Sequence, residues 1–87
     1  MERRTSRNAP EPVRISRKEL TSDDVIDRLD EGQRVIVVLE VFGVEREVTL
    51  RKTSTEYVCD TGFKLMTYDD RDGMKQCIER LRLARAE

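Results

Sequence analysis

Three short stretches of the chain contain residue types that could carry chemistry. The triplet DTG at residues 60–62 could present a carboxylate for acid–base catalysis, the acidic run that begins at Asp69 could bind a cation, and Cys59 with Cys77 could form a redox pair. The chain has no histidine, which removes the usual general base near neutral pH and the commonest metal ligand. Whether each stretch can perform this chemistry therefore depends on the other residues around it.

The triplet at residues 60–62 resembles the motif of retroviral-type aspartic proteases. One copy per chain would require a homodimer in which two Asp60 carboxylates share a proton. Those enzymes place the motif near the N-terminus of an all-β chain, whereas here only 25 residues follow Gly62 and most of them have a helical pattern. Phe63 also replaces the small residue expected after the triplet. We interpret the triplet as a turn and expect a protein without enzymatic activity.

The acidic run resembles part of a calcium-binding loop. Asp70, Asp72, Gly73 and Glu79 fall where the third, fifth, sixth and twelfth loop residues would be. The first ligand position holds Tyr68, whose aromatic ring cannot replace a carboxylate. We therefore expect the aspartates to cap a helix and to complement its dipole, and we expect no bound metal.

The two cysteines are typical of a reduced intracellular protein, because small secreted domains normally contain several disulfides. Cys59 is predicted on a strand and Cys77 in the apolar stripe of a helix, so both are expected to be small buried hydrophobic residues. Two cysteines cannot complete a Cys-rich zinc site, and their spacing is not Cys-x-x-Cys. We expect no cofactor, and regulatory thiol chemistry is the alternative.

Charge is abundant in the chain but nearly balanced. Of 87 residues 40% are charged, with 17 basic against 18 acidic groups, so the whole molecule has no field that attracts nucleic acid or an anionic membrane. Residues 1–20 contain six basic and three acidic side chains, whereas residues 21–87 contain eleven and fifteen. A basic arm thus precedes an acidic body, and the arm could neutralise nucleic-acid phosphates. Its cations are Arg3, Arg4, Arg7, Arg14, Arg17 and Lys18.

The arm and the body are predicted to differ in order. Residues 1–16 contain both prolines and almost no large apolar side chain before Val13, so they are predicted to be a disordered arm. Residues 17–87 are predicted to form one small domain. No apolar run reaches the roughly 18 residues of a membrane span, and the N-terminus lacks the apolar core of a secretory signal. We expect a cytoplasmic protein without membrane contact.

The hydrophobic pattern predicts two helices around a set of strands. A short helix begins after Thr21, which has the capping-box spacing to Asp24, and ends near Gly32. The β-branched run at residues 34–42 predicts a central strand, and the next residue, glycine, permits a reversal into a second strand at residues 44–52.

The remainder of the chain completes an α+β fold. Two short strands are predicted at residues 55–61 and 63–68, and apolar residues at helical spacing predict a longer helix within residues 69–87. The expected architecture is α-β-β-β-(β)-α, an antiparallel sheet of three to four strands with a short N-terminal helix and a longer C-terminal helix. The expected core consists of Val35, Val37, Leu39, Val48, Leu50, Ile78 and Leu81.

The order of elements is similar to that of the double-stranded-RNA-binding domain. That family contacts phosphates with a lysine cluster at the start of its last helix. Here Asp69, Asp70 and Asp72 occupy this position and would repel the RNA backbone. The body is therefore not expected to bind duplex RNA in that way.

The central strand is apolar on both faces, although one helix layer covers only one face. An uncovered apolar patch on a small sheet marks an interface. We expect the first helix to cover part of it and a protein partner or a second copy of the chain to cover the remainder. The candidate interface residues are Ile36, Val38, Phe42, Met66 and Tyr68.

The stretches YVCDT at residues 57–61 and GMKQCIERL at residues 73–81 resemble small uncharacterised proteins of halophilic archaea. That resemblance implies no known activity. The function predicted from the sequence is a small non-enzymatic binding or regulatory module that acts through protein contacts. The alternative is an accessory nucleic-acid-binding protein that uses the basic arm.

Overall fold

The structure is a computed structural model that describes residues 12–85. Within this range the chain forms five strands and two helices. In chain order they are β1 (Val13–Ser16), α1 (Ser22–Asp30), β2 (Val35–Val41), β3 (Val44–Lys52), β4 (Tyr57–Asp60), β5 (Leu65–Tyr68) and α2 (Arg71–Arg80).

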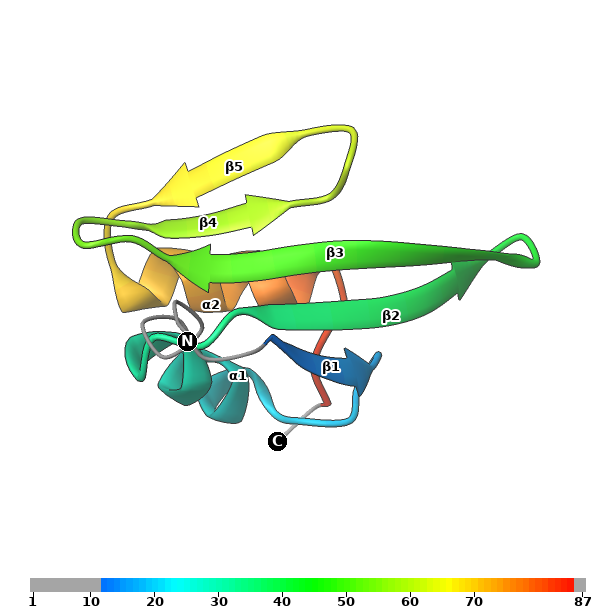
Figure 1. The fold of residues 1–87 in the computed structure, drawn as a ribbon, viewed down its shortest axis with the longest axis horizontal. Helices are drawn as coiled ribbons and strands as arrows, with labels where there is room; N and C mark the ends of the chain where they lie inside the picture. Colours follow the sequence, from blue (N-terminus) through cyan, green and yellow to red (C-terminus); the bar gives the residue numbers. More distant parts are fainter. Residues whose placement is uncertain (1–11, 86–87) are drawn as a thin grey trace, which may run out of the picture.

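The five strands form one sheet in the order β1-β2-β3-β4-β5 (Figure 1). β2 to β5 are successive antiparallel neighbours, whereas β1 is parallel to β2. A parallel pair needs a long crossover connection, and α1 supplies it. The α+β class is confirmed, but the expected sheet of three to four antiparallel strands is wrong by one strand and one parallel pair.

The additional strand, β1, lies in the segment predicted to be disordered. Val13 pairs with Val35, Ile15 pairs with Val37, and Ile15 is buried in the core. The assignment of residues 13–16 to the arm is therefore wrong, because the edge of β2 gives these residues hydrogen-bond partners and a place to bury one side chain. Residues 1–11 lie outside the described part of the chain.

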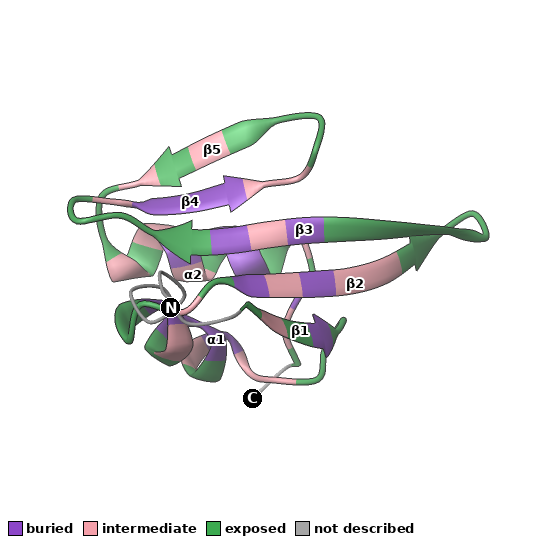
Figure 2. Ribbon diagram, in the orientation of Figure 1, coloured by how far each residue is buried: buried purple, intermediate pink, exposed green. Residues whose placement is uncertain are grey.

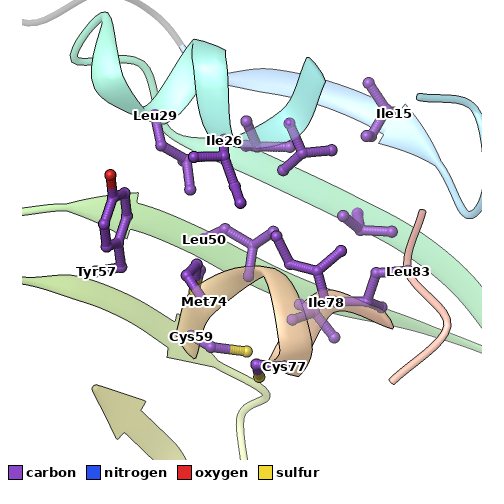
Figure 3. Close-up of a cluster of buried hydrophobic side chains, with 14 residues drawn as sticks. Ile15, Ile26, Leu29, Leu50, Tyr57, Cys59, Met74, Cys77, Ile78 and Leu83 are labelled. Atoms are coloured by element: carbon purple, nitrogen blue, oxygen red, sulfur yellow. The ribbon is translucent and has the colours of Figure 1, made fainter. Parts of the chain in front are cut away.

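Both helices cover the same face of the sheet. α1 packs on β2 and β3, α2 packs on β4 and β5, and the two helices contact each other. Buried residues gather between this helix layer and the middle of the strands (Figure 2). Figure 3 shows the core, which consists of Ile15, Val25, Ile26, Leu29, Val35, Val37, Val48, Leu50, Tyr57, Cys59, Met74, Cys77, Ile78 and Leu83.

The predicted core is correct at its centre and wrong at its border. Val35, Val37, Val48, Leu50 and Ile78 are buried. The other two predicted residues, on β2 and at the end of α2, are only partly buried and pack against the edge of the core; they are Leu39 and Leu81.

Each helix begins at a side chain predicted to cap it. The Thr21 hydroxyl oxygen accepts a hydrogen bond from the Asp24 N–H at 3.2 Å, and an Asp70 carboxylate oxygen accepts one from the Gly73 N–H at 2.8 Å. These bonds satisfy amide groups that have no partner within a helix. The capping interpretation of both segments is confirmed.

Each helix is closed by a residue with left-handed backbone conformation that directly follows the C-cap residue. This arrangement is known as a Schellman motif. After α1 this residue is Gly32, with φ of 90°, as the sequence indicates. After α2 it is Arg82, with φ of 58°, and the Leu83 N–H donates to the Ile78 carbonyl oxygen at 3.0 Å. This closure ends α2 at Arg80, so the longer helix predicted within residues 69–87 stops earlier than its apolar pattern indicates.

Candidate interaction surface at the hairpin end

Both phenylalanines of the chain lie on the surface. Phe42 is 100% exposed in the β2–β3 turn, and Phe63 is 83% exposed in the β4–β5 turn. Because β2 to β5 alternate in direction, these two turns lie at the same end of the sheet (Figure 1). Aromatic side chains usually bury a large area, so two exposed rings at one end of a small sheet indicate a binding surface.

The β2–β3 hairpin extends past the helix layer, and its outer part is exposed (Figures 1 and 2). Val41 pairs with Val44 next to the turn, and these valines are 41% and 53% exposed. Together with Phe42 they place three adjacent apolar side chains at the tip. We call Val41, Phe42, Val44 and Phe63 the hairpin-end surface.

The turn at the tip is strained. Its two central residues have positive φ, 52° at Phe42 and 78° at Gly43, which is typical of a type I′ turn. That turn prefers Asn-Gly, and a bulky residue at positive φ is a rare outlier. The cost is on the order of 1 kcal/mol or more, and the fully exposed ring recovers none of it through packing.

The second aromatic ring contacts a side chain of β3. The Arg46 guanidinium lies over the Phe63 ring, 5.2 Å from its centroid, in a cation–π contact. The contact joins the β4–β5 turn to the outer part of the hairpin. Phe63 therefore has a contact with the hairpin although most of its ring is exposed.

Acidic residues accompany the apolar tip. Glu40 and Glu45 lie directly opposite each other on β2 and β3, and both are exposed. Glu47 pairs with Arg14 at 2.8 Å, but no cation within residues 12–85 pairs with Glu40 or Glu45. Like charges directly opposite each other destabilise a sheet, and here they would also repel phosphates.

The residues predicted for an interface do not share one surface. Ile36 and Val38 lie on the helix-free face and are partly buried, whereas Met66 and Tyr68 pack against the core on the opposite face. The expectation of one common face is wrong because the β4–β5 register pairs Met66 and Tyr68 with buried residues of β4. Phe42 belongs to the hairpin-end surface.

The helix-free face is less bare than the sequence suggests. Val58 on this face is buried, and the ion pair between Arg14 on β1 and Glu47 on β3 spans the intervening strand. The first helix does not cover this face, because α1 lies with α2 on the other side. A homodimer through Ile36 and Val38 stays a prediction.

The Asp60 triplet forms a turn. An Asp60 carboxylate oxygen accepts a hydrogen bond from the Gly62 N–H at 2.9 Å, and the Thr61 hydroxyl oxygen accepts one from the Lys64 N–H at 3.1 Å. Gly62 has φ of 89°, which residues with a side chain rarely adopt. The interpretation of this triplet as a turn is confirmed.

Cys59 and Cys77 are free, buried thiols, and Figure 3 shows their side chains next to each other between β4 and α2. Burial raises the pKa of the Cys59 thiol to about 12, with a further contribution from Cys77. A thiol with so high a pKa is almost never ionised and is a poor nucleophile. The burial of both thiols therefore favours the interpretation of Cys59 and Cys77 as packing residues.

A polar cluster joins the two helices. Arg71 donates hydrogen bonds to Asp30 at 2.7 Å and to Asp27 at 2.8 Å, and Asp30 also accepts one from the Tyr57 hydroxyl at 2.6 Å. The Tyr57 hydrogen bond lowers the pKa of Asp30, and Lys52 and Arg71 lower it further. These contacts give the acidic residues of α1 a structural role.

The predicted nucleic-acid arm is only partly within the described residues. Arg14 forms an ion pair with β3, the Arg17 Nε–H donates to the Arg82 carbonyl oxygen at 2.9 Å, and Lys18 is exposed. Outside the described part of the chain lie Arg3, Arg4 and Arg7.

Sequence comparison places the chain in a family. DUF8001, a family of unknown function, matches residues 9–86, so the chain belongs to this family. No curated protein and no solved structure matches it significantly. Within residues 12–85, neither helix is long and apolar enough to cross a membrane.

Proposed function

We propose that this protein is a small non-enzymatic binding module that contacts another protein through the hairpin-end surface. The observation that carries the proposal is the complete exposure of Phe42 at a strained turn. The same six-residue stretch, residues 40–45, also contains two exposed valines and an opposed pair of glutamates. Residues that oppose the stability of their own fold are expected where they serve a partner.

The chemistry of the surface supports a protein partner. Phe42 suits an apolar pocket, since exposed aromatic residues commonly anchor interfaces. Glu40 and Glu45 beside it favour lysine or arginine on the partner and disfavour a nucleic acid or an anionic lipid surface. The two free cysteines support a reducing compartment, and we therefore also propose a cytoplasmic location.

Site-specific photocrosslinking tests this function. A benzophenone side chain at position 42 of the full chain, in a lysate of the source organism, is expected to give a discrete adduct. The control places the same group at Glu31, an exposed position after α1. An adduct of twice the chain mass would identify a second copy as the partner. Equal adducts from positions 42 and 31, or none from position 42, would contradict the proposal.

Phe42→Gly separates a role in binding from a role in folding. Removal of the ring relieves a left-handed aromatic residue, so we expect the free energy of unfolding to stay constant or rise by about 1 kcal/mol. Urea denaturation measures this change. We expect the same variant to lose the adduct formed by a benzophenone at Val44. A marked loss of stability would instead assign Phe42 to the fold.

A further inference from the structure

A second surface lies where the loop after β1 meets the segment after α2. Backbone hydrogen bonds join Lys18 N–H to the Leu83 carbonyl oxygen at 3.0 Å and Arg85 N–H to the Leu20 carbonyl oxygen at 2.7 Å. Figure 1 shows the C-terminal segment (red) beside the loop that follows β1. These hydrogen bonds join the two segments into one surface, although the segments are far apart in the sequence.

The surface formed by these two segments contains a cluster of cations. The Arg17 Nε–H donates to the Arg82 carbonyl oxygen at 2.9 Å, which fixes one guanidinium against the other segment. Glu19 is the only carboxylate among residues 17–21 and 82–85, and it accepts a hydrogen bond from the Ser16 N–H. The two segments contain four cations. All four are exposed, and none forms an ion pair with a residue between 12 and 85. We call Arg17, Lys18, Arg82 and Arg85 the basic junction.

Two of the four cations occupy backbone positions that favour glycine. Lys18 has φ of 66° and Arg82 has φ of 58°, whereas Gly32 occupies the corresponding position after α1. A residue with a Cβ atom is disfavoured there. The dipole of α2 favours a cation at Arg82, but Lys18 follows no helix. The fold alone therefore does not account for a cation at both positions.

We propose that the basic junction binds the phosphodiester backbone of a nucleic acid. Three guanidinium groups and one ammonium group supply N–H donors that suit phosphate oxygens. The junction contains no aromatic residue, so bases have no stacking platform and binding is expected to be independent of sequence. It also presents no exposed apolar side chain, because Leu83 is buried and Leu20 is half-buried, and an anionic membrane surface fits it less well.

This inference is independent of the proposed protein contact. It uses none of the residues of the hairpin-end surface, and it places the binding cations on the folded body in addition to the basic arm. Because the contacts join cations to phosphates, binding is expected to be strongest at low ionic strength.

Fluorescence anisotropy with the full chain tests the basic junction. The probes are a fluorescein-labelled single-stranded RNA of about 20 nucleotides and its DNA counterpart, a length that exceeds the site size of most small binding domains. We expect Kd to rise steeply with salt. Similar affinity for both probes would show that the shared phosphodiester is the ligand, and preference for RNA would add contacts to the 2′-hydroxyl.

The double variant Lys18→Gly/Arg82→Gly is expected to weaken binding about tenfold at low salt and to reduce the slope of log K against log salt by about 2. Arg34→Gln/Arg51→Gln changes the net charge by the same amount at two exposed positions outside the junction, and it is expected to change affinity much less. Lys18→Gln/Arg82→Gln removes the charges without adding glycine and should match the glycine variant in affinity.

Stability measurements distinguish lost binding from lost folding. The glycine variant relieves two left-handed side chains, so its urea midpoint is expected to rise while its affinity falls. The inference is overturned if neither probe binds at the lowest salt, if the junction variants bind like the wild-type chain, or if the Arg34/Arg51 control weakens binding equally. Binding to phosphatidylserine vesicles but to neither probe would also overturn it and would identify a membrane surface.

Discussion

Side chains at left-handed backbone positions mark both proposed surfaces. Within residues 12–85, glycine occupies three such positions, and Phe42, Lys18 and Arg82 occupy three others. The sequence identified Phe42 and Lys18 as candidate contact residues without indicating their backbone conformation. Backbone strain is invisible in a hydrophobic pattern, because it is defined by the turn that surrounding elements impose. Arg82 was missed for this reason.

Cys59 supplies a test at the scale of a single side chain. Its thiol has a pKa raised to about 12 by burial, so the folded chain should contain almost no Cys59 thiolate at mildly alkaline pH. We expect iodoacetamide, followed by mass spectrometry, to leave Cys59 unmodified in the native protein and to modify it in denaturant. Rapid labelling of the folded chain would contradict the buried position between β4 and α2.

Elements were predictable where their pattern is long and local. The runs that became β2 and β3 are clear in the sequence, as are both helix caps. β1 was not predictable, since four residues with two apolar side chains give too short a pattern, and the strand exists only beside β2. The end of α2 was also missed, because an arginine closes the helix where glycine is the usual signal. The hairpin-end surface could not be predicted because sequence does not show where the helix layer stops.

Two leucines test where α2 ends. Leu83 is 1% exposed and fills the core, whereas Leu81 is the half-buried C-cap residue. We expect Leu83→Ala to lower the free energy of unfolding by about 2–5 kcal/mol and Leu81→Ala to lower it by less than about 2 kcal/mol. Urea denaturation of the two variants measures these two changes in the free energy of unfolding. The reverse order would favour a helix that continues past Leu81.

On the scale of the whole molecule, the helix layer is closed by the polar cluster around Asp30 and Arg71. These contacts join α1 to α2 and, through Tyr57 and Lys52, to the sheet. The sequence predicted the helix caps, but it placed part of the first helix on the other face of the sheet and could not pair Asp30 with Arg71. Such pairing between exposed residues requires the relative placement of two helices, which is set by the core beneath them.

Asp30 gives the molecule a pH dependence. Its pKa is lowered from 3.8 in the folded state, so the unfolded chain binds the proton more readily, and the stabilisation is complete above that value and lost as pH falls through the folded pKa. Asp30→Asn is expected to destabilise the protein near neutral pH, and the difference from wild type should shrink below about pH 4. Urea midpoints across an acid series measure it, with Glu31→Gln as an exposed control. A difference that stays constant with pH would show that Asp30 acts through packing and not through its charge.

The bond between Arg17 and the Arg82 carbonyl group joins residues 65 positions apart, and Leu83 completes the core beside it. During synthesis at about 5–20 residues per second, these partners appear roughly 3–13 s after the first segment has been made. In that interval the apolar side chains of β1 and α1 lack Leu83, which shares their core in the folded protein. This part of the core therefore cannot close before residues 82–85 are available, which makes this interval the period in which a chaperone would be most useful to the nascent chain.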